Sequence, residues 1–283
     1  MEKIEIFDET FDPNRSESYN LAVQVSLNGI SFCINDTVRD MYVSFVSFPF
    51  NTSLSINDDW ENAVGQYFSL YDLLARSYKN VLLSFDSPLF TVVPTEFFTP
   101  EKAKQLFELV HPLPNLYEVR FNNLVESKST IIFALPSSLA AQWLIHQPRT
   151  SFIGHASPLI NYSSLIKAAK DEPLILSHFS EQFFINVISK NNELQHCCSF
   201  NYLDTNDTAY HLINTCKLAG IEPSVTEIDL CGSITDAEGL ELLLAQYFNK
   251  ALNRYSFDGH HYAYSLTKYK NIYWNLFNLS LCE

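Results

Sequence analysis

One pattern of alternating apolar and polar residues occurs twice in this chain, and it restricts the fold more than any single residue does. The first copy, LAVQVSLNGISFCINDTVRDMYVSFVSFPF, covers residues 21–50. The second, LILSHFSEQFFINVISKNNELQHCCSFNYL, covers residues 174–203 and so starts 153 residues later. Each copy contains three strand-like runs joined by short connections. A repeat of this kind predicts two similar structural units, but it says little about chemistry, because function resides in sites that a fold carries.

Each copy predicts three antiparallel strands in succession, followed by helices and by further short strands. In the first copy, Asn28-Gly29 is a strong hairpin signal between alternating runs. The strands expected there cover 21–27, 30–35 and 42–48. We therefore expect an α/β protein with a first domain over residues 1–149 and a second over residues 150–283. Each domain should hold a mixed sheet that opens with a three-stranded antiparallel meander and is flanked by helices.

Composition supports a folded protein and argues against several classes of function. The 283 residues are 47% hydrophobic and 18% charged, enough for two domains with real cores. The formal net charge is −14 and the basic residues are scattered singly, so we expect no nucleic acid partner. No apolar run approaches the roughly 20 residues of a membrane span. The acidic start, MEKIEIFDET, lacks a signal core, and six cysteines fit no CxxC pattern. We expect a cytoplasmic protein with reduced, buried thiols.

Three stretches together resemble the actin-like ATPase superfamily, whose domains are duplicated RNase H-like units. They are the meander at 21–48, the run SFIGHASPLINYSSLIKAAK that opens 151–202, and EIDLCGSITDAEGLELLLAQYF at 227–248. The second resembles the entry into the second domain of bacterial pilus-assembly actin-like proteins. The third is similar to the superfamily's adenosine motif, a buried strand with paired glycines before a Leu-rich helix. With its lead-in FDPNRSESYN, the chain resembles an uncharacterised bacterial family of this fold.

The resemblance implies two phosphate-binding turns and an adenosine motif, but their key residues are changed here. Active members carry an Asp-x-Gly turn in each domain, with Gly for close backbone approach and Asp for Mg²⁺. The corresponding positions in this chain are Ser26, Asn28, Gly29, His178, Ser180, Gly232 and Ser233. The whole chain has only 7 Gly, about a third of average usage. We therefore expect a degenerate nucleotide site with no catalytic residue, no cofactor and no metal.

Two other groups of residues suggest chemistry at first sight. His155, His178 and Glu181 could supply an acid/base pair, but His178 and Glu181 are three apart on an expected strand, which predicts that they face opposite sides. His260 and His261 are adjacent and therefore diverge, and no further ligand stands at a suitable spacing. Neither group is expected to form a catalytic or metal site.

The leading interpretation is a non-catalytic actin-like protein that serves as a scaffold or regulatory partner, bound to another protein or to a second copy of itself. The absence of the expected carboxylates favours it, since Mg²⁺-dependent phosphoryl transfer needs them. The alternative is a divergent actin-like or sugar kinase-like ATPase that binds nucleotide in the interdomain cleft. A third possibility is an enzyme that uses this cleft for other chemistry.

The aromatic tail, Tyr262–Leu281, is the one surface feature that could bind a partner. Tyr and Trp are favoured interface anchors, and the same residues could equally close the core. We expect the tail to pack against the second domain and to leave part of its aromatic face exposed.

Overall fold

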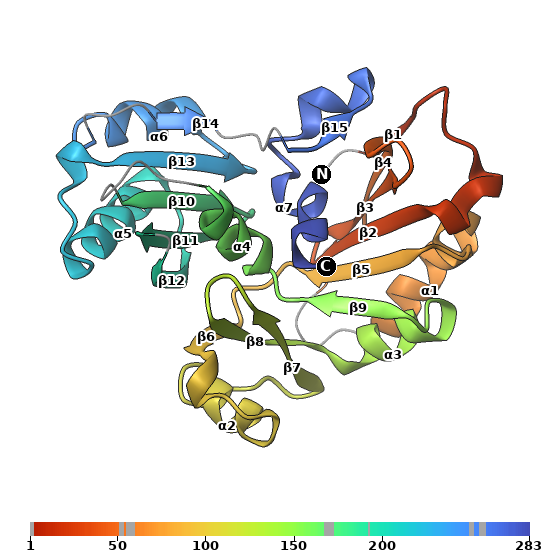
Figure 1. The fold of residues 1–283 in the computed structure, drawn as a ribbon, viewed down its shortest axis with the longest axis horizontal. Coiled ribbons are helices and arrows are strands. Elements are labelled where there is room, and N and C mark those ends of the chain that lie inside the picture. The colour runs from red at the N-terminus through yellow and green to blue at the C-terminus, as the bar shows by residue number, and fades with distance from the viewer. Residues whose placement is uncertain are drawn as a thin grey trace.

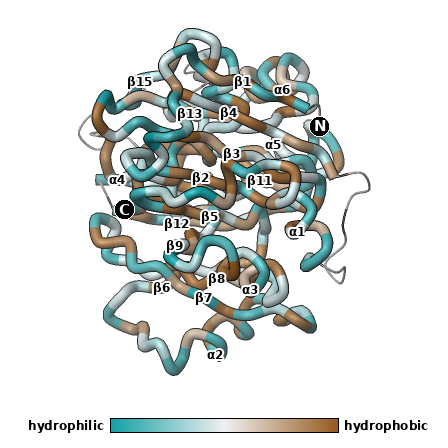
Figure 2. Tube along the Cα trace, turned by 90° about the vertical axis from the view of Figure 1, so that its right-hand side faces the viewer, coloured by the Kyte–Doolittle hydropathy of each residue, from teal (hydrophilic) through white to brown (hydrophobic). Residues whose placement is uncertain are grey.

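The computed structural model describes residues 3–50, 54, 60–166, 173–191, 193–248, 252–254 and 259–283. Two mixed sheets lie side by side, and a smaller sheet lies below them in the view of Figure 1. Figure 2 shows apolar stretches along the strands in the middle of the molecule and polar stretches at the outer turns. The described part of the chain therefore buries its strands and exposes its connections, as the alternating pattern predicts.

The first sheet has seven strands within the described residues, in the order β1-β4-β3-β2-β5-β9, with β15 also paired to β4. Its strands are β1 (Ile4–Phe7), β2 (Tyr19–Ser26), β3 (Gly29–Asp36), β4 (Met41–Pro49), β5 (Asn80–Phe85), β9 (Thr150–Ile153) and β15 (His261–Tyr262). β2, β3 and β4 are consecutive antiparallel strands, whereas β5 runs parallel to β2 and β9 parallel to β5. The expected meander of the first copy is confirmed.

The second sheet repeats this order with five described strands, β12-β11-β10-β13-β14. They are β10 (Leu174–Phe179), β11 (Phe183–Lys190), β12 (Glu193–Asn201), β13 (Glu227–Gly232) and β14 (Leu252–Arg254). Again three consecutive strands are antiparallel and the next two are parallel to their neighbours. The two sheets share strand order and strand direction, which confirms the expected fold class; their common origin by duplication stays a prediction.

A third, antiparallel sheet is inserted in the chain between β5 and β9. It contains β6 (Phe90–Pro94), β8 (Ser129–Pro136) and β7 (Tyr117–Leu124), in that spatial order. The helices are α1 (Trp60–Leu70), α2 (Ala103–Glu108), α3 (Ser137–His146), α4 (Ser157–Leu165), α5 (Thr205–Leu218), α6 (Ala237–Leu244) and α7 (Trp274–Phe277). Short 3-10 helices cover Pro13–Ser18, Asp72–Ala75, Thr95–Phe97, Pro100–Lys102, Pro223–Val225, Tyr264–Tyr269 and Leu279–Cys282. None of the helices in the described ranges is long and apolar enough to cross a membrane.

The two faces of the first sheet are covered by different parts of the chain. On one face, Leu21 and Val23 of β2 share a core with Val64 of α1 and Trp143 of α3. On the other face, apolar side chains of the sheet meet those of the C-terminal segment in a second cluster. This cluster contains Ala22, Cys33, Tyr42, Phe45, Leu82, Ile153, Ala263, Leu266, Leu276, Phe277 and Leu279. The central strands are thus buried on both faces, and small polar residues such as Ser44 and Ser47 are buried together with the apolar ones.

The position of the tail corrects one expectation from the sequence. The sequence places the tail on the second domain, but β15 lies beside β4 of the first sheet (Figure 1). Phe277 packs on the ring of Phe45, and the tail also contacts the second sheet, where α7 lies against β13. The reason is that apolar side chains on this face of the first sheet, among them Tyr42 and Phe45, form one hydrophobic cluster with those of the tail. Most of the tail's rings are covered, and Tyr264, at 93% exposure, is the clear exception. The expected exposed aromatic face is therefore largely absent.

The strand pairing also places the start of the expected second domain. β9 begins at Thr150, yet it extends the first sheet beside β5. The expected division after residue 149 therefore does not coincide with the division between the two sheets, because both β9 and the tail belong to the first.

The six cysteines are all free. Cys33, Cys216 and Cys231 are buried, as expected for structural thiols, and burial raises the pKa of each. Cys198 differs, since its side chain is exposed on β12.

Candidate functional site

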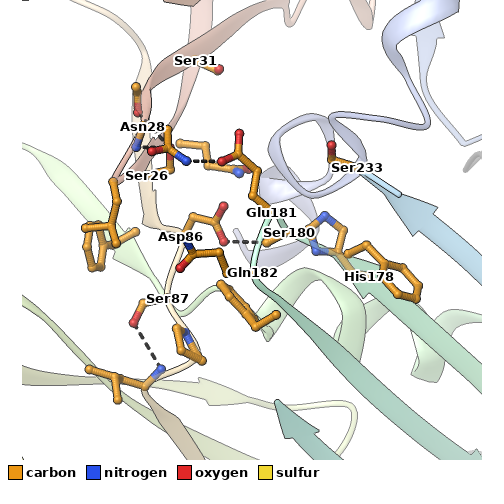
Figure 3. Close-up of a pocket in the computed structure, with 18 of the residues that line it drawn as sticks. Ser26, Asn28, Ser31, Asp86, Ser87, His178, Ser180, Glu181, Gln182 and Ser233 are labelled. Atoms are coloured by element: carbon orange, nitrogen blue, oxygen red, sulfur yellow. Dashed lines mark hydrogen bonds between the residues drawn. The ribbon is translucent and has the colours of Figure 1, made fainter. Parts of the chain in front are cut away.

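A cavity of about 620 Å³ lies where the two large sheets meet (Figure 3). Its walls come from the β2–β3 turn, the loop after β5, the β10–β11 turn and the loop before α7. Six of the seven positions singled out in the sequence line it: Ser26, Asn28, Gly29, His178, Ser180 and Ser233. Gly232 is adjacent in sequence but is not part of the wall. The fold thus brings together residues from both halves of the chain in one place of a size suited to a small molecule.

The two repeated hairpin turns contact each other across this cavity. Asn28, in the β2–β3 turn, donates a side-chain hydrogen bond to Glu181, in the β10–β11 turn. A second bridge lies deeper, where Ser180 Oγ donates to Asp86 Oδ1 at 2.7 Å. Both turns are therefore tied to the opposite half of the molecule through their side chains.

The backbone amides of the predicted phosphate-binding positions donate hydrogen bonds within the chain. The acceptors are side-chain or backbone oxygens at 2.8–3.2 Å. The pairs are Asn28 N to Ser26 Oγ, Ser180 N to Phe183 O, Gly232 N to Asn271 O and Ser233 N to Phe179 O. An amide engaged in this way has no proton left for a phosphate oxygen, so these four groups do not form an anion cradle as they stand.

Packing between strands explains the glycines that remain at this site. A Cβ on Gly29 would lie 2.0 Å from the carbonyl oxygen of Phe48 on the neighbouring strand. Gly232 has φ +91°, and a Cβ there would lie 2.2 Å from the carbonyl oxygen of Phe179. Both positions require glycine for the close approach of β-strands, whether or not a ligand binds.

Asp86 is a carboxylate at the centre of the site that the analysis of the sequence missed. It directly follows β5, and its Oδ1 lies 3.0 Å from Nε2 of His155 as well as accepting from Ser180. Burial raises the pKa of Asp86, but the neighbouring His155 and the hydrogen bonds outweigh burial and hold this pKa below its usual value. The signal that could have found Asp86 is its place at the carboxyl end of a parallel strand, where sites in open α/β sheets lie.

His155 links Asp86 to the C-terminal segment. The side-chain amide of Asn275, in α7, donates to Nδ1 of His155 at 2.9 Å and to its backbone oxygen at 3.0 Å. Since Nδ1 accepts, the ring proton resides on Nε2, which faces Asp86. Three segments far apart in the sequence thus meet in one buried polar chain, in which His155 and Asn275 are 3% and 1% exposed.

His178 is buried beside this chain and its ring hydrogen bonds are not satisfied. The residue is 4% exposed, its ring lies 5.3 Å from that of His155, and Nδ1 has no hydrogen-bond partner among the described residues. Burial, assisted by the proximity of His155, lowers the pKa of His178 to about 3, so the ring is neutral at physiological pH.

The structure also corrects the expectation that His178 and Glu181 face opposite sides. Both line the cavity, because β10 ends at Phe179 and Glu181 belongs to the following turn, where strand alternation no longer applies. A neutral His178 beside the ionised Asp86 could exchange protons with a bound molecule in principle. Among the described residues, the one hydroxyl group that hydrogen-bonds to the ring of His155 or His178 is Ser84 Oγ, which lies 3.4 Å from Nδ1 of His155.

The charged residues on the cavity wall are acidic. Its described lining includes Asp86 and Glu181 but no Lys or Arg.

The two adjacent histidines lie outside the cavity wall: His261 pairs with β4, and the ring of His260 packs 5.4 Å from that of Tyr42. No group of three or more side chains suited to a metal ion occurs in the part of the chain that the structure describes.

Known structures share this fold over nearly the whole chain. A Bacteroides thetaiotaomicron protein described as having an actin-like ATPase fold and unknown function is 24% identical, with a TM-score of 0.84, and the match covers 97% of this chain and 100% of that one. A chain of the PilM–PilN type IV pilus biogenesis complex is 12% identical, with a TM-score of 0.61, and 93% and 97% of the two chains are covered. At these identities the similarity establishes an actin-like ATPase fold.

A family model described as "Protein of unknown function (DUF3822)" matches residues 8–251 of the chain. This range includes both hairpin turns, Asp86 and His155, and it ends before the C-terminal segment. A comparison with curated proteins finds no match.

Proposed function

This chain belongs to the DUF3822 family of unknown function, and we propose that it is a non-catalytic actin-like protein that acts as a scaffold or regulatory partner. The observation that carries this proposal is the state of the two hairpin turns. The amides of Asn28 and Ser180 donate within the chain, and side-chain hydrogen bonds from Asn28 to Glu181 and from Ser180 to Asp86 bridge the two halves. A site used in this way joins two domains instead of binding phosphate.

Electrostatics supports the loss of nucleotide binding. A triphosphate in the cavity would lie near Asp86 and Glu181, and no Lys or Arg of the described lining would offset the repulsion. Mg²⁺ could in principle mediate between carboxylate and phosphate. Asp86, however, already uses Oδ1 to accept from Ser180 and to face His155, so it has only Oδ2 to offer a metal.

A solved structure of similar fold suggests that the chain acts through a protein partner. One structure of similar fold, the chain matched at a TM-score of 0.61, belongs to the PilM–PilN complex. We propose by analogy that this chain also acts through a protein partner or a second copy of itself, in the cytoplasm. The free cysteines agree with a reducing compartment.

One observation favours the alternative of a divergent ATPase. Asp86 supplies a carboxylate at the cavity, the group whose absence from both turns argues against phosphoryl transfer. This alternative requires that Asp86 hold a Mg²⁺ ion through Oδ2, its remaining oxygen, when nucleotide enters.

A thermal-shift series with ATP, ADP and GTP, each with and without Mg²⁺, tests the proposal. A ligand at a hundred times its dissociation constant should stabilise the folded chain by about 2.7 kcal/mol. We expect no shift with any nucleotide and no release of phosphate from ATP. Saturable stabilisation by Mg²⁺–ATP would overturn the proposal in favour of the divergent ATPase.

Sedimentation velocity over a wide range of concentrations tests the partner. A concentration-dependent dimer would identify a second copy as the partner. A monomer throughout would direct the search to a different protein.

A further inference from the structure

The cavity has the shape of a binding site with free acceptors on its wall. Asp86 Oδ1 is engaged by Ser180, but Oδ2 accepts no hydrogen bond from any described residue. Glu181 accepts from Asn28 through Oε2 alone and is otherwise exposed to the cavity. Two carboxylates therefore each present one unused oxygen to the same space (Figure 3). Such oxygens bind N–H and O–H donors and attract positive charge.

His178 is the second and independent sign of a ligand. Its ring lines the cavity, the residue is 4% exposed, and no described residue hydrogen-bonds to either ring nitrogen. Nδ1 is closed off from the cavity, so a ligand would meet the ring at Nε2, where a bound donor would satisfy the imidazole. A neutral imidazole presents a lone pair, which accepts from an ammonium group and offers no charge to an anion.

The rest of the wall suits a short hydrocarbon chain. The rings of Phe85, Tyr117 and Tyr273 line the cavity together with Leu27 and Leu89. Aromatic faces attract organic cations, and aliphatic side chains cover methylene groups. A volume of about 620 Å³ exceeds the needs of a single ion and falls in the range of small-molecule sites.

We propose that this cavity binds a small aliphatic amine carrying two or more ammonium groups, with Asp86 and Glu181 as charge partners and His178 as a neutral acceptor. The carboxylates, the absence of Lys and Arg from the described lining and the aromatic wall all select such a cation over a phosphorylated compound. The proposal rests on the part of the proposed function that excludes nucleotide from the cavity, and it is independent of the protein partner.

Isothermal titration calorimetry of the full chain with putrescine and with spermidine tests the proposal at neutral pH and physiological salt. We expect saturable binding of one molecule per chain for at least one of the two. Glu181→Gln keeps the shape of the side chain and removes its charge, and it should weaken binding at least about tenfold. His178→Phe, which removes the ring acceptor, should weaken binding as well.

Glu193→Gln is the matched control, because Glu193 is exposed on β12 of the same sheet and does not line the cavity. It should bind as the unmodified chain does. Equal weakening by the Glu181 and Glu193 variants would show general attraction to an acidic surface and would overturn the proposal, as would no saturable heat with either amine.

A parallel titration with Mg²⁺–ATP separates this proposal from the proposed function. Amine binding without ATP binding supports both. No binding of either ligand overturns the amine site and leaves the non-catalytic function standing. ATP binding overturns the proposed function whatever the amines do, and ATP binding without amine binding overturns both.

Discussion

Asn28 and Glu181 stand 153 residues apart, which is the spacing of the sequence repeat, and they are joined by a hydrogen bond across the cavity. They lie in corresponding hairpin turns, the turn after β2 and the turn after β10. The repeat brings its own two copies into contact at the place where the resemblance predicts phosphate. This contact ties the two sheets together at the wall of the cavity.

The Asn28–Glu181 contact should contribute little to the free energy of unfolding, but the effects of changing its two side chains should be coupled. Asn28→Ala is expected to lower the free energy of unfolding by about 0.2–1 kcal/mol, since the pair is partly exposed. Glu181→Ala should cost a similar amount, and the double variant no more than the larger single effect. Urea denaturation of all four proteins measures this cycle, and fully additive effects would show that the two side chains do not interact.

Asp86→Asn should be far more costly. It removes the charge that accepts from Ser180 and faces Nε2 of His155, and a hydrogen bond to a charged group contributes about 1.5–3 kcal/mol. We therefore expect a loss of about 2–3 kcal/mol in the free energy of unfolding by urea denaturation.

Glu193→Gln serves as the control for Asp86→Asn and should stay within about 0.5 kcal/mol of the unmodified chain. A stable Asp86→Asn protein would mean that the carboxylate is retained for a purpose other than joining the domains.

Acid should destabilise the protein through His178. Its pKa falls from 6.5 in the unfolded chain to about 3 in the folded one, so between these values the unfolded state binds more protons. Stability is therefore complete above pH 6.5 and declines as the pH falls toward 3, by at most about 1.4 kcal/mol per pH unit from this group. His178→Gln should flatten this part of the profile. An unchanged slope in the variant would assign the acid sensitivity elsewhere.

Phe277→Ala should disrupt the packing of the tail against the first sheet. Its fully buried ring packs on Tyr42 and Phe45, and replacing a buried Phe costs about 3–5 kcal/mol. Tyr264→Ala, at a ring 93% exposed in the same segment, should change the free energy of unfolding by less than about 0.5 kcal/mol. Removing residues 262–283 should cause aggregation; a shortened chain of equal stability would contradict the observed packing.

Two glycines with positive φ offer a test of why Gly232 is present. Gly220 has φ +67° and open space around a Cβ, so Gly220→Ala should cost only the backbone strain, about 1 kcal/mol. At Gly232, φ +91° is combined with the clash on Phe179, and Gly232→Ala should cost several times as much. Thermal denaturation of the two variants compares them. Equal effects would show that β13 can move away from β10.

The sequence predicted the strands of both meanders because successive side chains of a strand point to opposite faces of the sheet. The resulting alternation with a period of two can be read from neighbouring residues alone. The start of α5 is equally local, since the side chain of Asp204 caps this helix by accepting from the amides of Asn206 and Asp207. Each of these features depends on residues that are neighbours in the chain.

The sequence could not predict which sheet the tail covers, because both sheets offer apolar faces and no local pattern distinguishes them. The same holds for the buried polar chain of Asp86, His155 and Asn275, whose members come from three distant segments. Only the strand order brings them together. Glu181 was misplaced for a smaller reason: the strand before it ends two residues earlier than the alternation suggested.

The course of the tail has a consequence for how the molecule is made. The second hydrophobic cluster of the first sheet joins residues of β2, β3 and β4 to residues 263–279. During synthesis the first sheet can pair its strands early, but one of its faces stays uncovered until nearly the whole second sheet has left the ribosome. The first sheet is therefore synthesised first but completes its folding last. Its uncovered apolar face must be protected from aggregation while the second half of the chain is translated.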